Sequence, residues 1–205
     1  MTLTNRSLVL GILIALANSC FAQLGAVDAK CMTAMMPEVQ REIHLTKQQR
    51  KAINDAMTSI SKQAQADPSS MMGGGGDMMS SINDKLDAEA LASLDDGQKQ
   101  RLNELWIQYE GPAVMMTKPV ADKLGLTDDQ RKKVEDIIAK CNQSEMDAMM
   151  NSSKGMSAAK HAKADMEKIA KQRNADLLAV LIPDQTKTWE EMKGKPFKFK
   201  MPKST

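Results

Sequence analysis

The sequence predicts an all-α protein, and three observations support that prediction. Aromatic residues make up only 3% of the 205-residue chain, so the β-branched and aromatic runs that usually form strands are scarce. Apolar residues recur at steps of three and four along several long segments, as they do on one face of a helix. Short motifs in which Thr or Asp precedes Gln by three positions stand before these segments, where they would cap helices. We therefore expect long amphipathic helices that begin at capped turns.

The first 22 residues are expected to form a secretory signal peptide. Their only charge is Arg6, and the apolar run Leu8–Ala17 is shorter than the roughly 20 residues that a membrane span needs. The small-x-small pattern Cys20-Phe21-Ala22 follows, and we expect cleavage after Ala22. The alternative is a lipoprotein that carries its lipid on Cys20, but the residues before Cys20 fit a lipoprotein signal poorly. Cleavage predicts a periplasmic protein, and we expect no transmembrane segment elsewhere.

Two cysteines and a nearly balanced charge remain after that cleavage. Cys20 leaves with the signal, so Cys31 and Cys141 remain, and an even pair in an exported protein predicts a disulfide. Lys and Arg together number 28 against 26 Asp and Glu, and the loss of Arg6 narrows this difference further. A nearly neutral protein of this kind is not expected to bind nucleic acid.

The mature chain contains an internal repeat. Residues 39–55 match residues 120–136, and residues 94–98 match residues 181–185. Internal similarity at a fixed shift is the usual mark of a duplicated structural unit. In the first match Val39, Ile43, Leu45-Thr46, Gln49-Arg50-Lys51, Ile53 and Asp55 fall on Val120, Leu124, Leu126-Thr127, Gln130-Arg131-Lys132, Val134 and Asp136.

We interpret the repeat as two tandem helical-hairpin units at residues 37–116 and 117–196. Each unit is expected to contain a long helix, a loop, a second long helix and a shorter helix that ends near Gly-Pro. Residues 23–36 would form an N-terminal segment before the first unit, and residues 197–205 a basic tail after the second.

Four related motifs are predicted to open helices in these units. In the first, Thr46 is expected to be the N-cap and Gln49 the third helical residue, so that each side chain satisfies the other's backbone N–H. In the last, Ile182 cannot cap, but Pro183 suits the first helical position. Taken alone, such motifs predict helix starts and nothing more. The motif residues are Leu45, Thr46 and Gln49; Leu94, Asp95 and Gln98; Leu126, Thr127 and Gln130; and Leu181 and Gln185.

Apolar stripes after the motifs predict the long helices. Cys141 continues one of them and is therefore expected to face a core. Hairpin loops are predicted at residues 67–77 and 151–155, and the first should be mobile because the run Gly73–Gly76 cannot sustain a helix. The stripes are Ile53, Ala56, Met57 and Ile60; Met79, Ile82 and Leu86; Val134, Ile137, Ile138 and Cys141; and Ala162, Met166, Ile169, Ala170, Arg173, Leu177 and Val180, where Arg173 is a charged interruption.

Four copies of the Leu-[Thr/Asp/Ile]-x-x-Gln motif in an exported, methionine-rich chain resemble the LTxxQ family of Spy and CpxP envelope proteins. The resemblance covers most of residues 37–196, with two strict copies and two degenerate ones. It implies thin, curved helical hairpins that dimerise into a cradle, and a role as an ATP-independent chaperone or stress sensor. This chain departs from the family by carrying two units, so it is expected to be a monomeric pseudo-dimer or a homodimer.

No catalytic constellation is apparent, so we expect a protein that is not an enzyme and uses no cofactor. The two histidines, His44 and His161, lie in different helical contexts without carboxylates or cysteines at matching spacing. The glycine run Gly73–Gly76 lacks the Lys-Ser/Thr of a phosphate-binding loop. We accordingly assign no metal ligands.

Methionine is unusually frequent, with 18 residues, many of them in adjacent pairs. Neighbours on a helix point about 100° apart, so a core can bury at most one of each pair. Three interpretations remain open: gap-filling core residues, an adaptable surface for apolar clients, and a thioether site for Cu(I) with His44 or His161. For client binding we single out the residues that flank the glycine run, which are Met71, Met72, Met78 and Met79.

The basic tail region interleaves Lys195, Lys198 and Lys200 with Phe197 and Phe199. It would either make weak contact with an anionic envelope surface or dock its phenylalanines on the helical bundle, and we favour docking. The leading functional hypothesis is a periplasmic binding protein of the Spy/CpxP type that holds unfolded or envelope protein clients. The alternative is a methionine-rich copper-sensing or copper-buffering protein, and a structural envelope protein is a third possibility.

Overall fold

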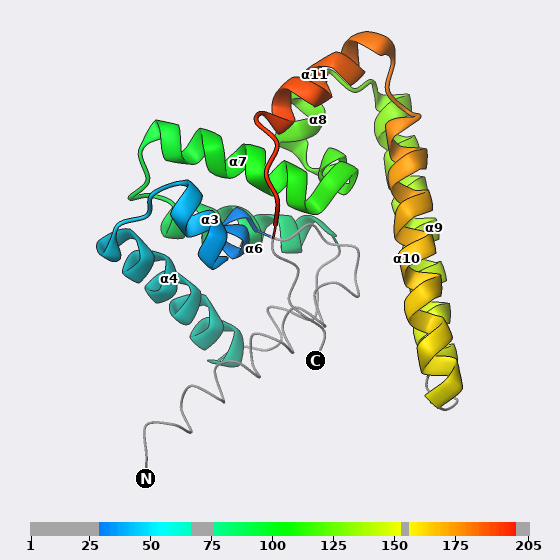
Figure 1. The fold of residues 1–205 in the computed structure, drawn as a ribbon, viewed down its shortest axis with the longest axis horizontal. Coiled ribbons are helices and arrows are strands. Elements are labelled where there is room, and N and C mark those ends of the chain that lie inside the picture. The colour runs from blue at the N-terminus through cyan, green and yellow to red at the C-terminus, as the bar shows by residue number, and fades with distance from the viewer. Residues whose placement is uncertain (1–28, 67–75, 153–155, 200–205) are drawn as a thin grey trace. The chain divides into compact units, whose positions relative to one another are not determined.

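The computed structural model describes residues 29–66, 76–152 and 156–199, and this part of the chain contains helices and turns but no strand (Figure 1). The predicted all-α class is confirmed for these residues. The helices are α2 (Lys30–Ala34), α3 (Pro37–Glu42), α4 (Lys47–Ala66), α6 (Gly76–Ala90), α7 (Asp96–Glu110), the 3-10 helix η2 (Gly111–Met116), α8 (Lys118–Leu124), α9 (Asp128–Ser152), α10 (Met156–Leu178) and α11 (Pro183–Lys193).

Contacts divide the described residues into two compact units. The main unit contains residues 29–66, 76–126 and 181–199, and the α9–α10 hairpin contains residues 127–152 and 156–180. Within the hairpin the two long helices lie side by side (Figure 1). In the main unit α8 and α11, from the second expected repeat, pack with η2 and α7 from the first. Grouping by contact therefore differs from grouping by repeat, and the tandem duplication stays a prediction.

A carboxylate from α6 holds the start of α2 in the core of the main unit. Asp87 accepts hydrogen bonds from the backbone N–H groups of Lys30 at 3.0 Å and Cys31 at 2.8 Å. Ala29 at the N-cap has no side-chain acceptor, so Asp87 supplies the cap from a distant helix. Burial raises the pKa of the Asp87 carboxyl, although these two hydrogen bonds favour its charged form. The surrounding core cluster contains Ala29, Cys31, Ala34, Val39, Ile43, Leu45, Ile53, Ala56, Leu86, Ala90, Leu91, Leu94, Leu102 and Leu105.

Thr33 on α2 provides a first stability prediction. Its side chain is fully buried, and among the described residues its hydroxyl has no hydrogen-bond partner. Because valine has the same shape without the hydroxyl, Thr33→Val is expected to raise the free energy of unfolding by about 1 kcal/mol. Urea unfolding followed by circular dichroism measures this change. A loss of stability would show that the hydroxyl is in fact satisfied in solution.

Residues that the repeat matches adopt the same local backbone. His44 and Gly125 both have left-handed conformations, with φ of 52° and 62°. The next residue in each copy, Leu45 or Leu126, donates its N–H to a carbonyl of the preceding short helix. The side chains buried at matched positions are Val39/Val120, Ile43/Leu124, Leu45/Leu126 and Ile53/Val134.

The left-handed turns predict opposite effects for two substitutions. A side chain in this conformation costs roughly 1 kcal/mol, which glycine avoids. We therefore expect His44→Gly to stabilise the main unit by about 1 kcal/mol, and Gly125→Ala to destabilise it by a similar amount. A Cβ at Gly125 would meet no atom within 4 Å, so the second change tests backbone conformation alone. Equal urea midpoints for the three proteins would contradict the prediction.

Candidate functional site

The four motifs lie at helix starts, and three of them form reciprocal capping boxes. Gln49 N donates to Thr46 Oγ1 at 3.2 Å, and Thr46 N donates to Gln49 Oε1 at 2.9 Å. At the fourth motif Ile182 N donates to Gln185 Oε1 at 3.1 Å, but isoleucine has no oxygen for the return bond. The same two bonds as in the first motif join Asp95 with Gln98 and Thr127 with Gln130. Of the preceding leucines, Leu45, Leu94 and Leu126 are buried and Leu181 is half-buried.

The motif glutamines also join segments that are far apart in the sequence. Gln49 Nε2 donates to Gln98 Oε1 at 2.7 Å and to the Ser93 carbonyl at 3.0 Å. Gln98 Nε2 in turn donates to the Ile43 carbonyl at 3.0 Å. The two amides therefore bind each other and the turn that precedes the opposite helix.

The two motif glutamines in the second half of the chain also donate to backbone carbonyls of distant turns. In the hairpin, Gln130 Nε2 donates to the Val180 carbonyl at 2.9 Å. In the main unit, Gln185 Nε2 donates to the Gly125 carbonyl at 3.2 Å. Each acceptor lies two residues before an N-cap, as Ser93 does for Gln49. The motif side chains are thus used in the fold's own hydrogen bonds, which leaves them a structural role.

The methionines chosen from the sequence cannot be placed. Met71 and Met72 lie outside the described residues, as do the side chains of Met78 and Met79. The adjacent pair in η2 does follow the expected rule, because Met115 is buried and Met116 is 41% exposed.

A cluster of exposed methionines lies on α9 instead. Met146, Met149 and Met150 are 51%, 38% and 65% exposed. Their spacing of three and four residues places them on one face of the helix. We call these three residues the α9 methionine face. Met149 and Met150 are one of the adjacent methionine pairs in the sequence, and Met146 precedes them at helical spacing, which sequence analysis did not single out.

The interior of the α9–α10 hairpin changes from apolar to polar along α9. Val134, Ile138 and Cys141 are buried, as the apolar stripe predicts. One turn after Cys141, Glu145 lies 3.5 Å from Arg173 of α10, and both side chains are largely covered. The methionine face starts at the next residue, so here α9 combines a polar contact with its partner helix and exposed thioethers.

Cys31 and Cys141 are both buried, and both are free thiols in this structure. Burial raises the pKa of each thiol, with a further increase from the Asp87 carboxylate at Cys31. Cys31 belongs to the main unit and Cys141 to the hairpin. The predicted disulfide between them is absent here and stays a prediction for the exported protein.

The start of the basic tail docks on the main unit, as we favoured. Phe197 and Phe199 pack against the core cluster, and their ring centroids are 5.0 Å apart. Gln108 accepts a hydrogen bond from Phe197 N at 2.8 Å, and Arg101 donates to the Lys195 carbonyl at 2.9 Å. Lys200 and the residues after it lie outside the described part of the chain.

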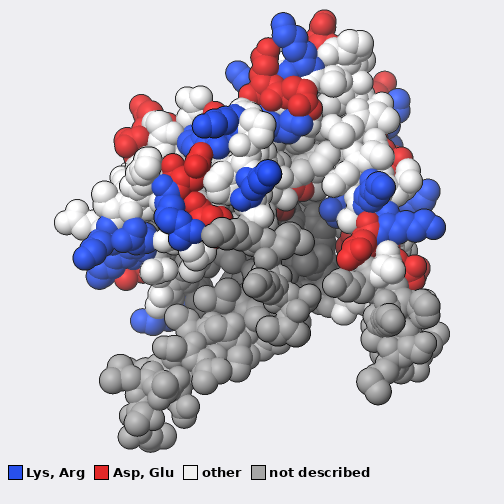
Figure 2. All heavy atoms as spheres, in the orientation of Figure 1, with Lys and Arg blue, Asp and Glu red and all other residues white. Residues whose placement is uncertain are grey.

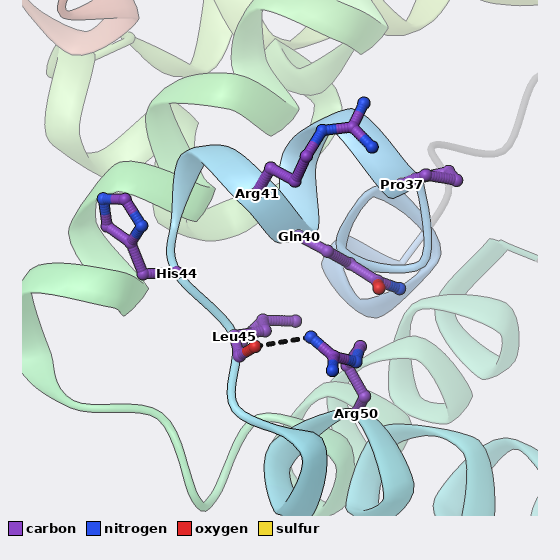
Figure 3. Close-up of a pocket in the computed structure, with 6 residues that line it drawn as sticks. All are labelled: Pro37, Gln40, Arg41, His44, Leu45 and Arg50. Atoms are coloured by element: carbon purple, nitrogen blue, oxygen red, sulfur yellow. Dashed lines mark hydrogen bonds between the residues drawn. The ribbon is translucent and has the colours of Figure 1, made fainter.

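A groove at the turn between α3 and α4 is lined by Arg41, His44 and Arg50, but these side chains do not point toward a common centre (Figure 3). The groove has a volume of about 630 Å³ (Figure 3). Arg41 and His44 point in different directions, while Arg50 donates to the Leu45 carbonyl at 2.6 Å (Figure 3). With the charges separated in this way, the groove is a weak candidate for an anion site.

The rest of the surface formed by the described residues offers no stronger candidate. Acidic and basic side chains are interspersed on the face shown in Figure 2. Within the described ranges, no helix is long and apolar enough to cross a membrane. In those ranges we also find no group of three or more His, Cys, Asp or Glu side chains placed to hold a metal ion. The α9 methionine face is therefore the most distinctive feature of the described surface.

Comparisons of this chain with family models, with curated proteins and with solved structures give no match.

Proposed function

We propose that this protein is a periplasmic binding protein that holds unfolded or envelope protein clients without ATP, as members of the Spy/CpxP family do. The observation that carries the proposal is the α9 methionine face, with three exposed thioether side chains on one side of a long helix. Methionine is flexible and polarizable, so such a face adapts to apolar segments of different shape. Met71, Met72, Met78 and Met79 are proposed to contribute in the same way.

Within this proposal, the motif geometry supports separate roles for the capping residues and the methionines. The capping glutamines hold helix starts together, while the three α9 methionines are exposed to solvent. Client binding should therefore depend on the methionines and stability on the caps. This separation makes the proposal testable with two kinds of variant in the same hairpin.

The test is suppression of aggregation of a reduced, unfolded client protein. Replacing Met146, Met149 and Met150 together by Ser should weaken protection severalfold. Each site is exposed, so the free energy of unfolding should change by no more than about 0.5 kcal/mol per substitution. Full protection by the triple variant would refute the proposed surface.

Two controls match this experiment. Met116→Ser removes an exposed methionine from the main unit and should leave protection unchanged. Thr127→Ala removes the cap of α9 and should lower stability by about 1 kcal/mol, with little effect on client protection. A loss of protection in Thr127→Ala equal to that in the methionine variant would mean that stability, and not the methionines, governs binding.

A further inference from the structure

The last described segment of the chain, residues 194–199, forms neither helix nor strand and crosses α7 (Figure 1). We call it the C-terminal strap. Phe197 and Phe199 are half-buried against the core cluster, while Lys198 between them is exposed. Side chains at every second residue face the protein in this way when a segment is extended. The strap therefore lies on the main unit as an extended peptide.

One amide on α7 binds the strap backbone on both sides of Pro196. Gln108 Nε2 donates to the Lys195 carbonyl at 3.0 Å, and Gln108 Oε1 accepts from Phe197 N at 2.8 Å. Arg101 also donates to the Lys195 carbonyl, at 2.9 Å. These hydrogen bonds go to main-chain groups, so they suit an extended segment of any sequence.

The surface beneath the strap combines a fixed cation with an aromatic wall. The Arg101 guanidinium forms ion pairs with Glu42 at 2.8 Å and Glu104 at 2.7 Å, neither of which involves the strap. Tyr109 of α7 packs against Phe199, with ring centroids 5.2 Å apart. The cation thus holds its position independently of the strap, and the ring contact selects an aromatic side chain.

The strap can leave α7 without the loss of α11. Gly194 ends α11 with φ of 59°, a left-handed turn that glycine adopts without strain. The strap has no helix or strand of its own to unfold. Gln108 Nε2 also donates to the Lys193 carbonyl at the end of α11, at 2.6 Å, and this bond keeps the amide in place when the strap leaves.

We propose that the strap occupies a peptide-binding groove on α7, and that an extended client segment with aromatic residues at alternate positions binds there by displacing it. In recognition of this kind, main-chain hydrogen bonds supply affinity and the alternate side chains supply selectivity. The strap acts as a competitor within the same chain and lowers the apparent affinity for a client segment. This groove lies in the main unit and does not depend on the α9 methionine face.

The experiment measures binding of a fluorescein-labelled peptide with the strap's own sequence, Gly-Lys-Pro-Phe-Lys-Phe, by fluorescence anisotropy. Replacing Phe197 and Phe199 together by Ser in the full-length protein undocks the strap. This double variant should bind the peptide at least about tenfold more tightly than the parent does, because the competitor is gone. Adding Gln108→Ala to the double variant should weaken binding by about tenfold, through the loss of two main-chain hydrogen bonds.

Three controls accompany these measurements. Gln100→Ala changes an exposed glutamine on the same helix and should leave the peptide affinity of the double variant unchanged. A peptide of the same composition with adjacent aromatic residues, Gly-Pro-Lys-Lys-Phe-Phe, should bind at least about tenfold more weakly. The serine variant of the α9 methionine face should bind the strap peptide as the parent does, which separates this groove from the proposed client surface.

A second measurement follows the strap in the parent protein and needs no variant. Fluorophenylalanine incorporated in place of phenylalanine labels Phe197 and Phe199 for fluorine NMR. Excess unlabelled strap peptide should move both signals to the positions they have in unfolded protein. Unchanged strap signals with the peptide bound, equal peptide affinities of the parent and the double variant, or unchanged affinity on adding Gln108→Ala would each overturn the proposal.

Discussion

Replacing Gln98 by Ala is expected to lower the free energy of unfolding of the main unit by about 2–4 kcal/mol. The substitution removes the hydrogen bond that caps α7 at Asp95 and the bonds to Gln49 and to the Ile43 carbonyl. Each such bond contributes roughly 1 kcal/mol, and partly buried groups left unpaired add to the loss. Urea unfolding followed by circular dichroism measures the change.

Gln100→Ala is the matched control, because Gln100 lies on the same helix, is exposed and bonds only to Glu104 among the contacts resolved here. Its effect should stay within about 0.5 kcal/mol. A double-mutant cycle with Gln49→Ala and Gln98→Ala should give a coupling of about 1 kcal/mol or more between the two amides. Simple additivity would mean that the two motifs do not stabilise each other.

Replacing Asp87 by Ala is expected to cost about 2–4 kcal/mol, since hydrogen bonds to a charged group each contribute about 1.5–3 kcal/mol. The variant leaves the N–H groups of Lys30 and Cys31 without their acceptor. α2 has only five residues and depends on this cap, so its packing on α7 should loosen. Thiol labelling of Cys31 should then become faster, because α2 loosens and because the thiol loses the carboxylate that raises its pKa.

Asp84→Ala provides the control on the same helix, because Asp84 is exposed. It should leave both the unfolding free energy and the labelling rate of Cys31 close to those of the parent. Equal effects of the two substitutions would contradict the capping role of Asp87.

The capping boxes could be predicted because they join residues only three positions apart. Thr46 with Gln49 and Thr127 with Gln130 form the bonds that their spacing predicts. The pairing of Gln49 with Gln98 could not be read in this way, since it depends on how distant turns pack. The predicted loops at residues 67–77 and 151–155 each overlap a helix end by two residues, because α6 starts at Gly76 and α9 ends at Ser152.

The helix in the N-terminal segment likewise could not be predicted from local sequence. Residues 23–36 contain no capping residue that predicts α2, because the acceptor that stabilises its start comes from Asp87 on another helix. The contact between Cys31 and Met57 is likewise a product of tertiary packing. The starts of the short helices α3 and α8, in contrast, are marked in the sequence, because each helix has proline within its first two positions.

The most direct test of the proposed client-binding function is an NMR titration of protein labelled at the methionine methyl groups. On addition of a reduced, unfolded client, the signals of Met146, Met149 and Met150 should shift or broaden first. The buried Met115 should not respond, which controls for a general change in the fold. Client binding with unchanged signals from the three α9 methionines would contradict the account.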